Sequence, residues 1–261
     1  MSALRLDAVS KSFGGVAAVS AVSFAVPQGR IFALIGPNGA GKTTLFNLIS
    51  GVYRPSSGSV FLSERDVTAE PPHVRAREGL ARTFQTPQVF LDMRAIENVM
   101  VGAHRHLDVG LLPALVRPRG FRAAERRCRD EAMTIMERLG LARFAETEAG
   151  ALPYGALKRL EVARAMASGP RLLLLDEPAA GLNAGEAEEM MEVVRMVAGT
   201  GVTVVLIEHN MRMVMGLAER VLVLVSGRML VEGTPAEVQR HPEVVAAYLG
   251  AAPPEKERRC A

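Results

Sequence analysis

The sequence has little of what marks secreted or membrane-spanning proteins. Its 261 residues include two cysteines, Cys128 and Cys260, which are too few for a disulfide framework and are expected to be reduced thiols. Its most apolar runs, such as RLLLLD and GVTVVLIE, have the length of strands and fall far short of the ~20 residues that a membrane helix needs. The first residues show no charged segment followed by an apolar one, so no secretory signal is expected. We therefore expect a chain that does not span a bilayer.

Charge of one sign is also scarce. The chain has 31 Lys and Arg against 28 Asp and Glu, a formal net charge of +3. Binding of nucleic acid requires a clustered basic stripe, so no nucleic-acid partner is expected. The mild basic balance suits a cytosolic surface or one that faces acidic lipid headgroups. No internal repeat is visible, which indicates one copy of the folding unit.

Short apolar runs separated by helical patterns predict an α/β fold. Four runs rich in Val, Leu and Ile lie at RIFALIG, RLLLLD, GVTVVLIE and RVLVLV, and such runs are typical of buried parallel strands. Helices are expected on both faces of this sheet. Nearer the start, LRLDAVS and SAVSFAV alternate with a period of two on either side of FGG, which predicts an antiparallel flank.

The middle of the chain, about 88–166, has helical periodicity and no convincing strand. Core packing, rather than a cofactor site, explains a stripe of residues at helical spacing: Phe121, Ala124, Cys128, Ala132, Ile135, Met136 and Leu139. Residues 104–120 contain two prolines and read as an irregular insertion, and 251–261 as a flexible tail. We predict one domain over 1–250, with the helical block inserted into the α/β core as a subdomain.

A glycine-rich segment carries the strongest chemical signal. GPNGAGKT fits the pattern G-x-x-x-x-G-K-[ST], with an expected strand before it and a helix after it. Glycines allow successive backbone N–H groups to surround phosphate oxygens, while Lys42 reaches the β- and γ-phosphates and the Thr43 hydroxyl binds Mg²⁺. The alternative is a strand-to-helix turn with an incidental Lys-Thr pair, which the flanking elements disfavour. The predicted nucleotide-binding residues here are Gly36, Pro37, Asn38, Gly39, Ala40, Gly41, Lys42, Thr43 and Thr44.

Polar residues at the ends of other expected strands complete a hydrolytic site. Asp176 and Glu177 follow RLLLLD, at the edge of the sheet where ligands of open α/β folds bind. Asp176 is predicted to hold Mg²⁺ through its shell, and Glu177 to polarise a water aimed at the γ-phosphate. His209 would donate to the γ-phosphate, and Gln85 would contact both the metal and the attacking water. Taken singly, they also fit a solvated turn, a satisfied strand-end histidine and a surface amide.

The order of these motifs resembles the ATP-binding subunits of ABC transporters over residues 1–250. That order is an aromatic at Phe13, the phosphate loop, Gln85, a signature helix, LLLLDE, a GLN turn and His209. KSFGGVAAV, GLARTFQ, LDEPAAGLN and EGTPAEVQRHPEVVAAYLG look like the subunits of bacterial branched-chain amino acid importers. The resemblance implies an ABC-type P-loop NTPase core, in which a RecA-like, mostly parallel sheet has an antiparallel β flank and an inserted helical subdomain.

The resemblance also implies roles for three further groups of residues. Phe13 would stack on adenine, although a buried turn aromatic is the alternative. A D-loop that crosses to a second cassette corresponds to Gly181, Leu182 and Asn183. The signature that would face the nucleotide of that cassette corresponds to Leu152, Pro153, Tyr154, Gly155 and Ala156.

The signature departs from the usual Leu-Ser-Gly-Gly-Gln of the family. Its serine hydroxyl and glutamine amide are absent, although Gly155 can still present its N–H to an anion at a helix start. A hydrogen bond to a charged group contributes about 1.5–3 kcal/mol, so we expect the partner's site to be the weaker of two unequal ATP sites. Individually, Pro153 and Ala156 also fit a plain N-terminal turn.

The implied function is that of an ATPase dependent on ATP and Mg²⁺ that powers an importer, most similar to those for branched-chain amino acids. Its expected partners are membrane-spanning permease subunits, a second, unlike cassette and, indirectly, a periplasmic solute-binding protein. Its expected place is peripheral, at the cytoplasmic face of the inner membrane. Alternatives are a soluble ABC ATPase of DNA repair or translation, a P-loop kinase, and a cassette for an amide, urea or lipopolysaccharide. The first of these usually carries a second cassette, a coiled coil or zinc-binding additions.

Overall fold

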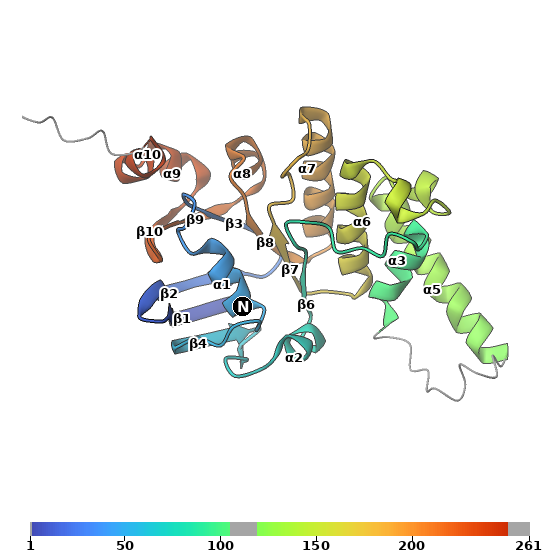
Figure 1. The fold of residues 1–261 in the computed structure, drawn as a ribbon, viewed down its shortest axis with the longest axis horizontal. Helices are drawn as coiled ribbons and strands as arrows, with labels where there is room; N and C mark the ends of the chain where they lie inside the picture. Colours follow the sequence, from blue (N-terminus) through green and yellow to red (C-terminus); the bar gives the residue numbers. More distant parts are fainter. Residues whose placement is uncertain (1, 105–118, 250–261) are drawn as a thin grey trace, which may run out of the picture.

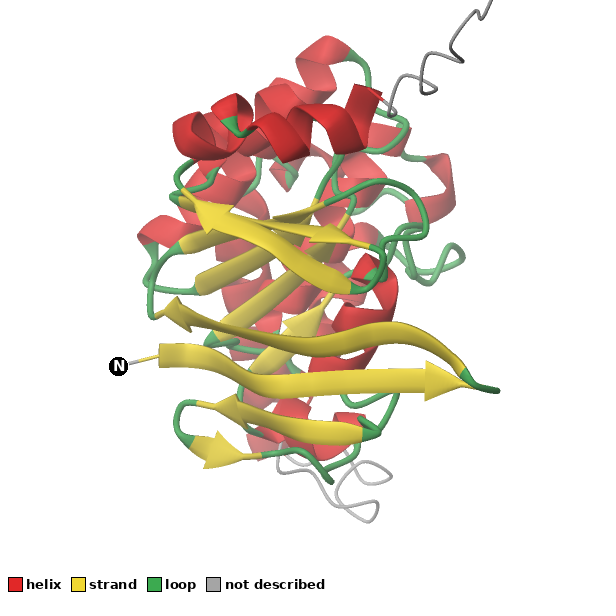
Figure 2. Ribbon diagram, turned by 90° about the vertical axis from the view of Figure 1, so that its left-hand side faces the viewer, coloured by secondary structure: helices red, strands yellow, loops and turns green. Residues whose placement is uncertain are grey.

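The computed structural model describes residues 2–104 and 119–249, which form two sheets with helices around them (Figures 1 and 2). The larger sheet has six strands in the order β10-β9-β3-β8-β7-β6. The smaller has four, in the order β2-β1-β4-β5. This mixed α/β architecture confirms the predicted fold class.

The four apolar runs form the centre of the larger sheet, as predicted. They are β3 (Ile31–Ile35), β7 (Leu172–Asp176), β8 (Thr203–Ile207) and β9 (Arg220–Val225), and β8 pairs in parallel with β3 and β7, as β9 does with β3. Their side chains alternate between two cores: Ala33 and Ile35 enter one, Phe32 and Leu34 the other. Burial on both faces explains why these strands are apolar throughout.

Two strands at the edges of this sheet escaped prediction. They are β6 (Leu80–Arg82), which is parallel to β7, and β10 (Arg228–Gly233), which is antiparallel to β9. With three residues, β6 is too short to show a period, and β10 contains Arg228 and Glu232 among its apolar residues. Edge strands bury less surface, so their sequences carry a weaker apolar signal.

The antiparallel flank is confirmed, and it corrects one expectation. β1 (Ser2–Phe13) and β2 (Val16–Pro27) pair in antiparallel, and β4 (Ser57–Leu62) and β5 (Arg65–Asp66), which were not predicted, extend their sheet. Helices were expected on both faces of the larger sheet. One face is instead covered mainly by the smaller sheet together with the first helix. Alternate residues of the smaller sheet, such as Leu4, Leu6 and Phe24, are apolar and share one core with the larger sheet.

The helices are distributed along the whole length of the molecule in Figure 1. Their bounds are α1 (Lys42–Ile49), α2 (Pro72–Arg77), α3 (Ala95–Gly102), α5 (Arg119–Arg138), α6 (Tyr154–Ala167), α7 (Ala184–Gly199), α8 (Met211–Leu217), α9 (Pro235–Arg240) and α10 (Pro242–Leu249). α3, α5 and α6 pack together at the end opposite α9 and α10.

The helical middle is confirmed for the part that the structure describes. Within 88–104 and 119–166 there is no strand, only an isolated bridge between Arg94 and Glu148. On the predicted stripe, Cys128, Ala132, Met136 and Leu139 are buried and Ala124 and Ile135 are partly buried, whereas the side chain of Phe121 lies outside the described residues. Most of the predicted insertion at 104–120 and the whole tail at 251–261 also lie outside them, and the division into domain and subdomain stays a prediction.

Candidate functional site

The loop between β3 and α1 has a backbone that only glycine allows at two points. Gly36 and Gly41 have φ values of 153° and 97°. A Cβ added to Gly36 would lie 2.1 Å from the carbonyl oxygen of Leu224, and one added to Gly41 would lie 2.4 Å from that of Ala18. Residues 36–44, which we call the phosphate half-site, are therefore folded tightly against the neighbouring strand ends.

The start of α1 favours an anion. Gly41 is its N-cap residue, and among the described residues no side chain caps this end and none in its first turn is acidic. The first N–H groups of a helix have no intrahelical partner, and they carry the positive end of the helix dipole. Amides of this kind at a helix start are a common binding site for phosphate groups.

A cavity of about 620 Å³ opens over this loop. Most of the predicted loop residues line it, with Gln85 and Glu177 among them. Sequence reasoning missed one wall, which consists of Val16, Ala17, Ala18, Ser226 and Gly227. Four of these residues have no polar side chain, and Ser226 has a single hydroxyl in no recognisable motif, so their place in the fold was needed to reveal them.

Lys42 lies inside this cavity. Its Nζ donates to the carbonyl oxygens of Gly36 at 2.7 Å and Pro37 at 3.0 Å. Burial lowers the pKa of Lys42, and the nearby carboxylates of Glu177 and Asp176 oppose that shift. A cation that is partly stripped of water gains strongly from an anionic ligand.

Glu177, Gln85 and His209 meet at one carboxylate oxygen. The Nε2 of Gln85 donates to Glu177 Oε2 at 2.9 Å, and His209 Nδ1 lies 3.8 Å from the same oxygen. Glu177 has a φ of 49°, a left-handed conformation that is unusual for a residue other than glycine and is found mostly at functional sites. The structure thus brings together the three residues predicted to act on the γ-phosphate.

Asp176 forms a buried ion pair that sequence reasoning missed. Arg82 Nη2 lies 2.9 Å from Asp176 Oδ2, and the two side chains are 7% and 9% exposed. Nη1 of the same guanidinium donates to Asn47 Oδ1 at 2.6 Å and Ser50 Oγ at 3.0 Å. Arg82 therefore joins α1, β6 and β7; its place three residues before Gln85 was the one available signal.

The predicted signature, residues 152–156, forms the start of α6 and is here called the signature half-site. Leu152 and Ala156 are buried, and Pro153 is the N-cap residue, without a side-chain cap among the described residues. Gly155 lies against the carboxylate of Glu186, since a Cβ added there would be 2.8 Å from Glu186 Oε1. Its residues are absent from the described lining of the cavity above the phosphate half-site.

The predicted D-loop lies beside the signature half-site. A Cβ on Gly181 would be 3.0 Å from Cε1 of Tyr154, which is 42% exposed. Leu182 is partly buried. Asn183 caps α7 by accepting the N–H of Glu186 at 3.0 Å. The signature half-site and the D-loop, which the resemblance expects to face a second cassette, are therefore neighbours on one surface of this chain.

Phe13 lies at the end of β1, outside the described lining of the cavity. Its ring is 44% exposed and packs edge-on against Tyr53, with 5.3 Å between ring centres. Lys11 Nζ lies 5.1 Å from the ring centre of Phe13. An exposed aromatic fits the predicted adenine contact better than the alternative of a buried turn residue, but this role stays a prediction.

Comparisons with known proteins agree with the nucleotide-binding chemistry of this site. Residues 19–180 match the family described as "ABC transporter", and residues 228–253 match "Branched-chain amino acid ATP-binding cassette transporter". The chain belongs to the ABC transporter family. As an ABC cassette it binds ATP and couples its hydrolysis to transport.

Relatives of this ABC cassette extend over nearly its whole length. It is 41% identical to the high-affinity branched-chain amino acid transport ATP-binding protein BraF of Pseudomonas aeruginosa and 43% identical to LivG of Salmonella typhimurium; both alignments cover 95% of this chain and 98% of the relative. It is 36% identical to the lipopolysaccharide export system ATP-binding protein LptB of Acidithiobacillus ferridurans, over 95% of this chain and 96% of that one. The solved ADP conformation of MJ1267, an ATP-binding cassette of an ABC transporter, shares 32% identity and a TM-score of 0.84, covering 96% of this chain and 99% of that one.

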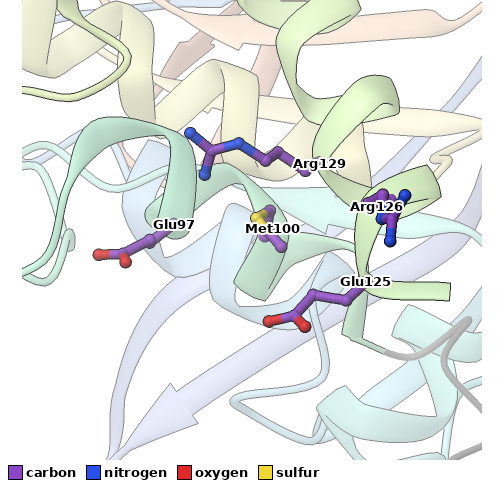
Figure 3. Close-up of a pocket in the computed structure, with 5 residues that line it drawn as sticks. All are labelled: Glu97, Met100, Glu125, Arg126 and Arg129. Atoms are coloured by element: carbon purple, nitrogen blue, oxygen red, sulfur yellow. The ribbon is translucent and has the colours of Figure 1, made fainter. Parts of the chain in front are cut away.

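A second cavity of the cassette lies between α3 and α5. It has a volume of about 380 Å³ and is lined by Glu97, Met100, Glu125, Arg126 and Arg129 (Figure 3). Its acids and guanidinium groups come from two helices, without a glycine-rich turn. This lining differs from that of the cavity above the phosphate half-site, which contains the glycine-rich turn and Lys42.

The described residues contain neither a membrane-spanning helix nor a disulfide bond. No helix within the described ranges is long and apolar enough to cross a membrane. Cys128 is a free, buried thiol, and burial raises its pKa; a thiol that stays protonated is unreactive. Cys260 lies outside the described residues.

Proposed function

We propose that this cassette is the ATPase subunit of an importer of branched-chain amino acids. The observation that carries the proposal is its similarity, over nearly its full length, to relatives named for branched-chain amino acid transport. The match at 228–253, which begins with β10 and includes α9 and α10, adds support from a separate part of the chain.

ATP fits the cavity above the phosphate half-site. The free amides at the start of α1 and the ammonium of Lys42 supply positive charge where the phosphates would lie. Lys42 would leave the carbonyl oxygens of Gly36 and Pro37 for the β- and γ-phosphates. The Phe13 ring would provide the apolar contact for adenine.

Mg²⁺ fits the same place, with few protein ligands. No cluster of three or more His, Cys, Asp or Glu occurs within the described parts of the chain, but Mg²⁺ bound to a nucleotide needs only one or two protein oxygens besides phosphates and waters. We assign it to the side-chain oxygens of Thr43 and Gln85, with Asp176 holding it through its hydration shell. Because Arg82 engages Asp176 Oδ2, this carboxylate would contact that shell through its other oxygen. The ion would neutralise charge on the phosphates.

Glu177 is the proposed general base. Its carboxylate lines the cavity and accepts from Gln85, so the pair can orient a water toward the γ-phosphate. His209, at 3.8 Å from the carboxylate, would approach the same phosphate as a donor. Positioning of this kind, rather than covalent chemistry, accounts for most catalysis of phosphoryl transfer.

The proposed partners are membrane-spanning permease subunits and a second, unlike cassette. Placement of this chain at the cytoplasmic face of the inner membrane and an indirect link to a periplasmic solute-binding protein belong to the same proposal. An intact signature on the unlike cassette would complete the ATP site of this chain. Its own signature half-site, with Pro153 in place of serine, would complete the weaker site of the partner.

Uptake assays test the transported solute. In a strain that lacks the gene, labelled leucine, isoleucine and valine should enter only when the wild-type cassette is restored, and not with Lys42→Ala. Urea and an aliphatic amide serve as control solutes, and export of lipopolysaccharide is followed in parallel. Loss of a control solute, or of lipopolysaccharide export, with intact uptake of branched-chain amino acids would contradict the proposal.

Co-purification tests the partners. Detergent extracts of membranes should yield the tagged chain with two permease subunits and a cassette of different mass. Recovery of this chain with only a second copy of itself would contradict the unlike pair.

A further inference from the structure

Two buried charges on α6 contact the loop that carries Gln85. Lys158 and Glu161 are each 2% exposed and lie about one turn apart on the helix. The described lining of the ATP cavity does not include either of them. Burial of a charge is costly unless the charge is paired or hydrogen-bonded, so the groups that they bind indicate what they do.

Glu161 holds the loop on both sides of Gln85. Its Oε1 accepts the backbone N–H of Phe84 and that of Gln88, each at 3.2 Å. Burial raises the pKa of Glu161, and the two N–H groups oppose that shift. One carboxylate oxygen thus fixes both ends of the segment 84–88.

Lys158 binds the two residues of the hydrolytic pair through their backbones. Its Nζ donates to the carbonyl oxygen of Gln85 at 2.5 Å and to that of Glu177 at 3.3 Å. The side chains of the same two residues meet at 2.9 Å. Because Glu177 has a left-handed backbone, a partner for its carbonyl also helps to maintain that conformation.

The N-terminus of the same helix, close to Lys158, forms the signature half-site. Lys158 Nζ lies 5.8 Å from the ring centre of Tyr154, and the Tyr154 ring packs on Gly181. A helix of this length moves as a rigid unit, so a displacement of its N-terminus also displaces Lys158 and Glu161. α6 therefore contacts the surface expected to face a second nucleotide and the residues expected to act on the first.

We propose that Lys158 and Glu161 are positioning residues for ATP hydrolysis, which set Gln85 and Glu177 relative to each other and tie that arrangement to the start of α6. The proposal rests on the proposed function, because it takes Glu177 as the base. It makes α6 the element through which occupancy of the signature half-site affects hydrolysis in the chain's own site.

Lys158→Met tests the role, because it keeps the length of the side chain and removes its donors. Loss of alignment at a reacting centre costs on the order of ten- to a hundredfold in kcat. The Kd for ATP should change by less than about twofold, because the substitution leaves the contacts that bind ATP in the ground state in place. Both are measured on the full-length cassette in the complex purified from membranes. An unchanged kcat would overturn the proposal.

A double-mutant cycle with Gln85→Ala separates positioning from general stability. If Lys158 acts through Gln85, most of the loss in kcat caused by Gln85→Ala should vanish in the Lys158→Met background. Additive losses would overturn the proposal. Should Lys158→Met fail to melt cooperatively, the same cycle is run with Lys158→Gln, and additive losses in that cycle would overturn the proposal as well.

Arg159→Met is the matched control on the same helix. Its guanidinium pairs with Glu189 of α7 at 3.0 Å, away from the segment 84–88, so the loss caused by Gln85→Ala should persist in full. Glu177→Gln distinguishes the proposed function from the positioning role. If that substitution leaves turnover intact, the proposed function fails; if it abolishes turnover while the Lys158 cycle is additive, only the positioning role fails.

Discussion

The phosphate half-site and the signature half-site both begin a helix, yet they are built differently. α1 starts at Gly41, whose backbone is closed against Ala18 and allows no side chain. α6 has Pro153 as its N-cap residue, and the atoms nearest to a Cβ added at Gly155 belong to the flexible side chain of Glu186. In contrast, α7 and α8 carry side-chain caps from Asn183 and Asn210.

Their anchors differ in the same way. The helix that follows the phosphate half-site is anchored by Arg82, which binds Asn47, Ser50 and the buried Asp176. On α6, besides the buried Lys158, Arg159 is 12% exposed and pairs with Glu189, whose side chain is 57% exposed. A rigid backbone suits a site that must surround phosphates, while a start with few fixed partners suits a surface completed by another subunit. The two half-sites should therefore tolerate substitutions unequally.

The largest effect is expected at the hydrolytic carboxylate. Glu177→Gln should reduce turnover by a factor of about 10²–10⁴, the range of general base catalysis, because the amide cannot accept a proton from water. Affinity for ATP should remain, since Lys42 and the loop amides are untouched. Turnover of the purified complex and nucleotide binding are the measurements. The equivalent substitution in the unlike cassette should cost less, and equal losses would contradict unequal sites.

The next largest effect is expected on stability. Arg82→Met removes one partner of a buried pair and should destabilise the fold by about 3–5 kcal/mol. Arg159→Met on the signature side should cost less, because Glu189 is 57% exposed and stays hydrated when the guanidinium is removed. Denaturant unfolding of both variants measures the difference. Similar costs would show that the two half-sites are anchored alike.

A smaller effect is expected from a methyl group in the phosphate half-site. Gly41→Ala places a Cβ 2.4 Å from the carbonyl oxygen of Ala18, at a φ of 97°, and should cost about 1–3 kcal/mol of strain. Affinity for ATP should fall with it, as titration with a fluorescent nucleotide would show. Gly199→Ala is the control, because a Cβ there meets nothing within 4 Å and affinity should not change.

The smallest effect is expected from restoring a hydroxyl to the signature half-site. Pro153→Ser supplies α6 with an N-cap acceptor, a feature whose removal elsewhere costs about 0.5–2 kcal/mol. The melting temperature should rise slightly, and turnover of the weaker ATP site should increase. A fall in both would indicate that Pro153 itself is needed at this turn.

Local pattern was enough to predict the central strands and the phosphate loop. β3, β7, β8 and β9 are mostly apolar because both of their faces are buried, and the loop requires glycine at positions 36 and 41. β6 was missed because three residues show no period, and the smaller sheet was underestimated because an apolar face does not reveal what covers it.

The sequence by itself determined that a glycine-rich turn follows a buried strand, and that acids, an amide and a histidine end the neighbouring strands. Only the tertiary structure decided that Arg82 pairs with Asp176, that Lys158 joins Gln85 to Glu177, and that Tyr154 lies on Gly181. Periodicity in the sequence indicates on which face of its own helix or strand a residue lies. These contacts depend on how separate elements pack, so the fold has to form before they exist.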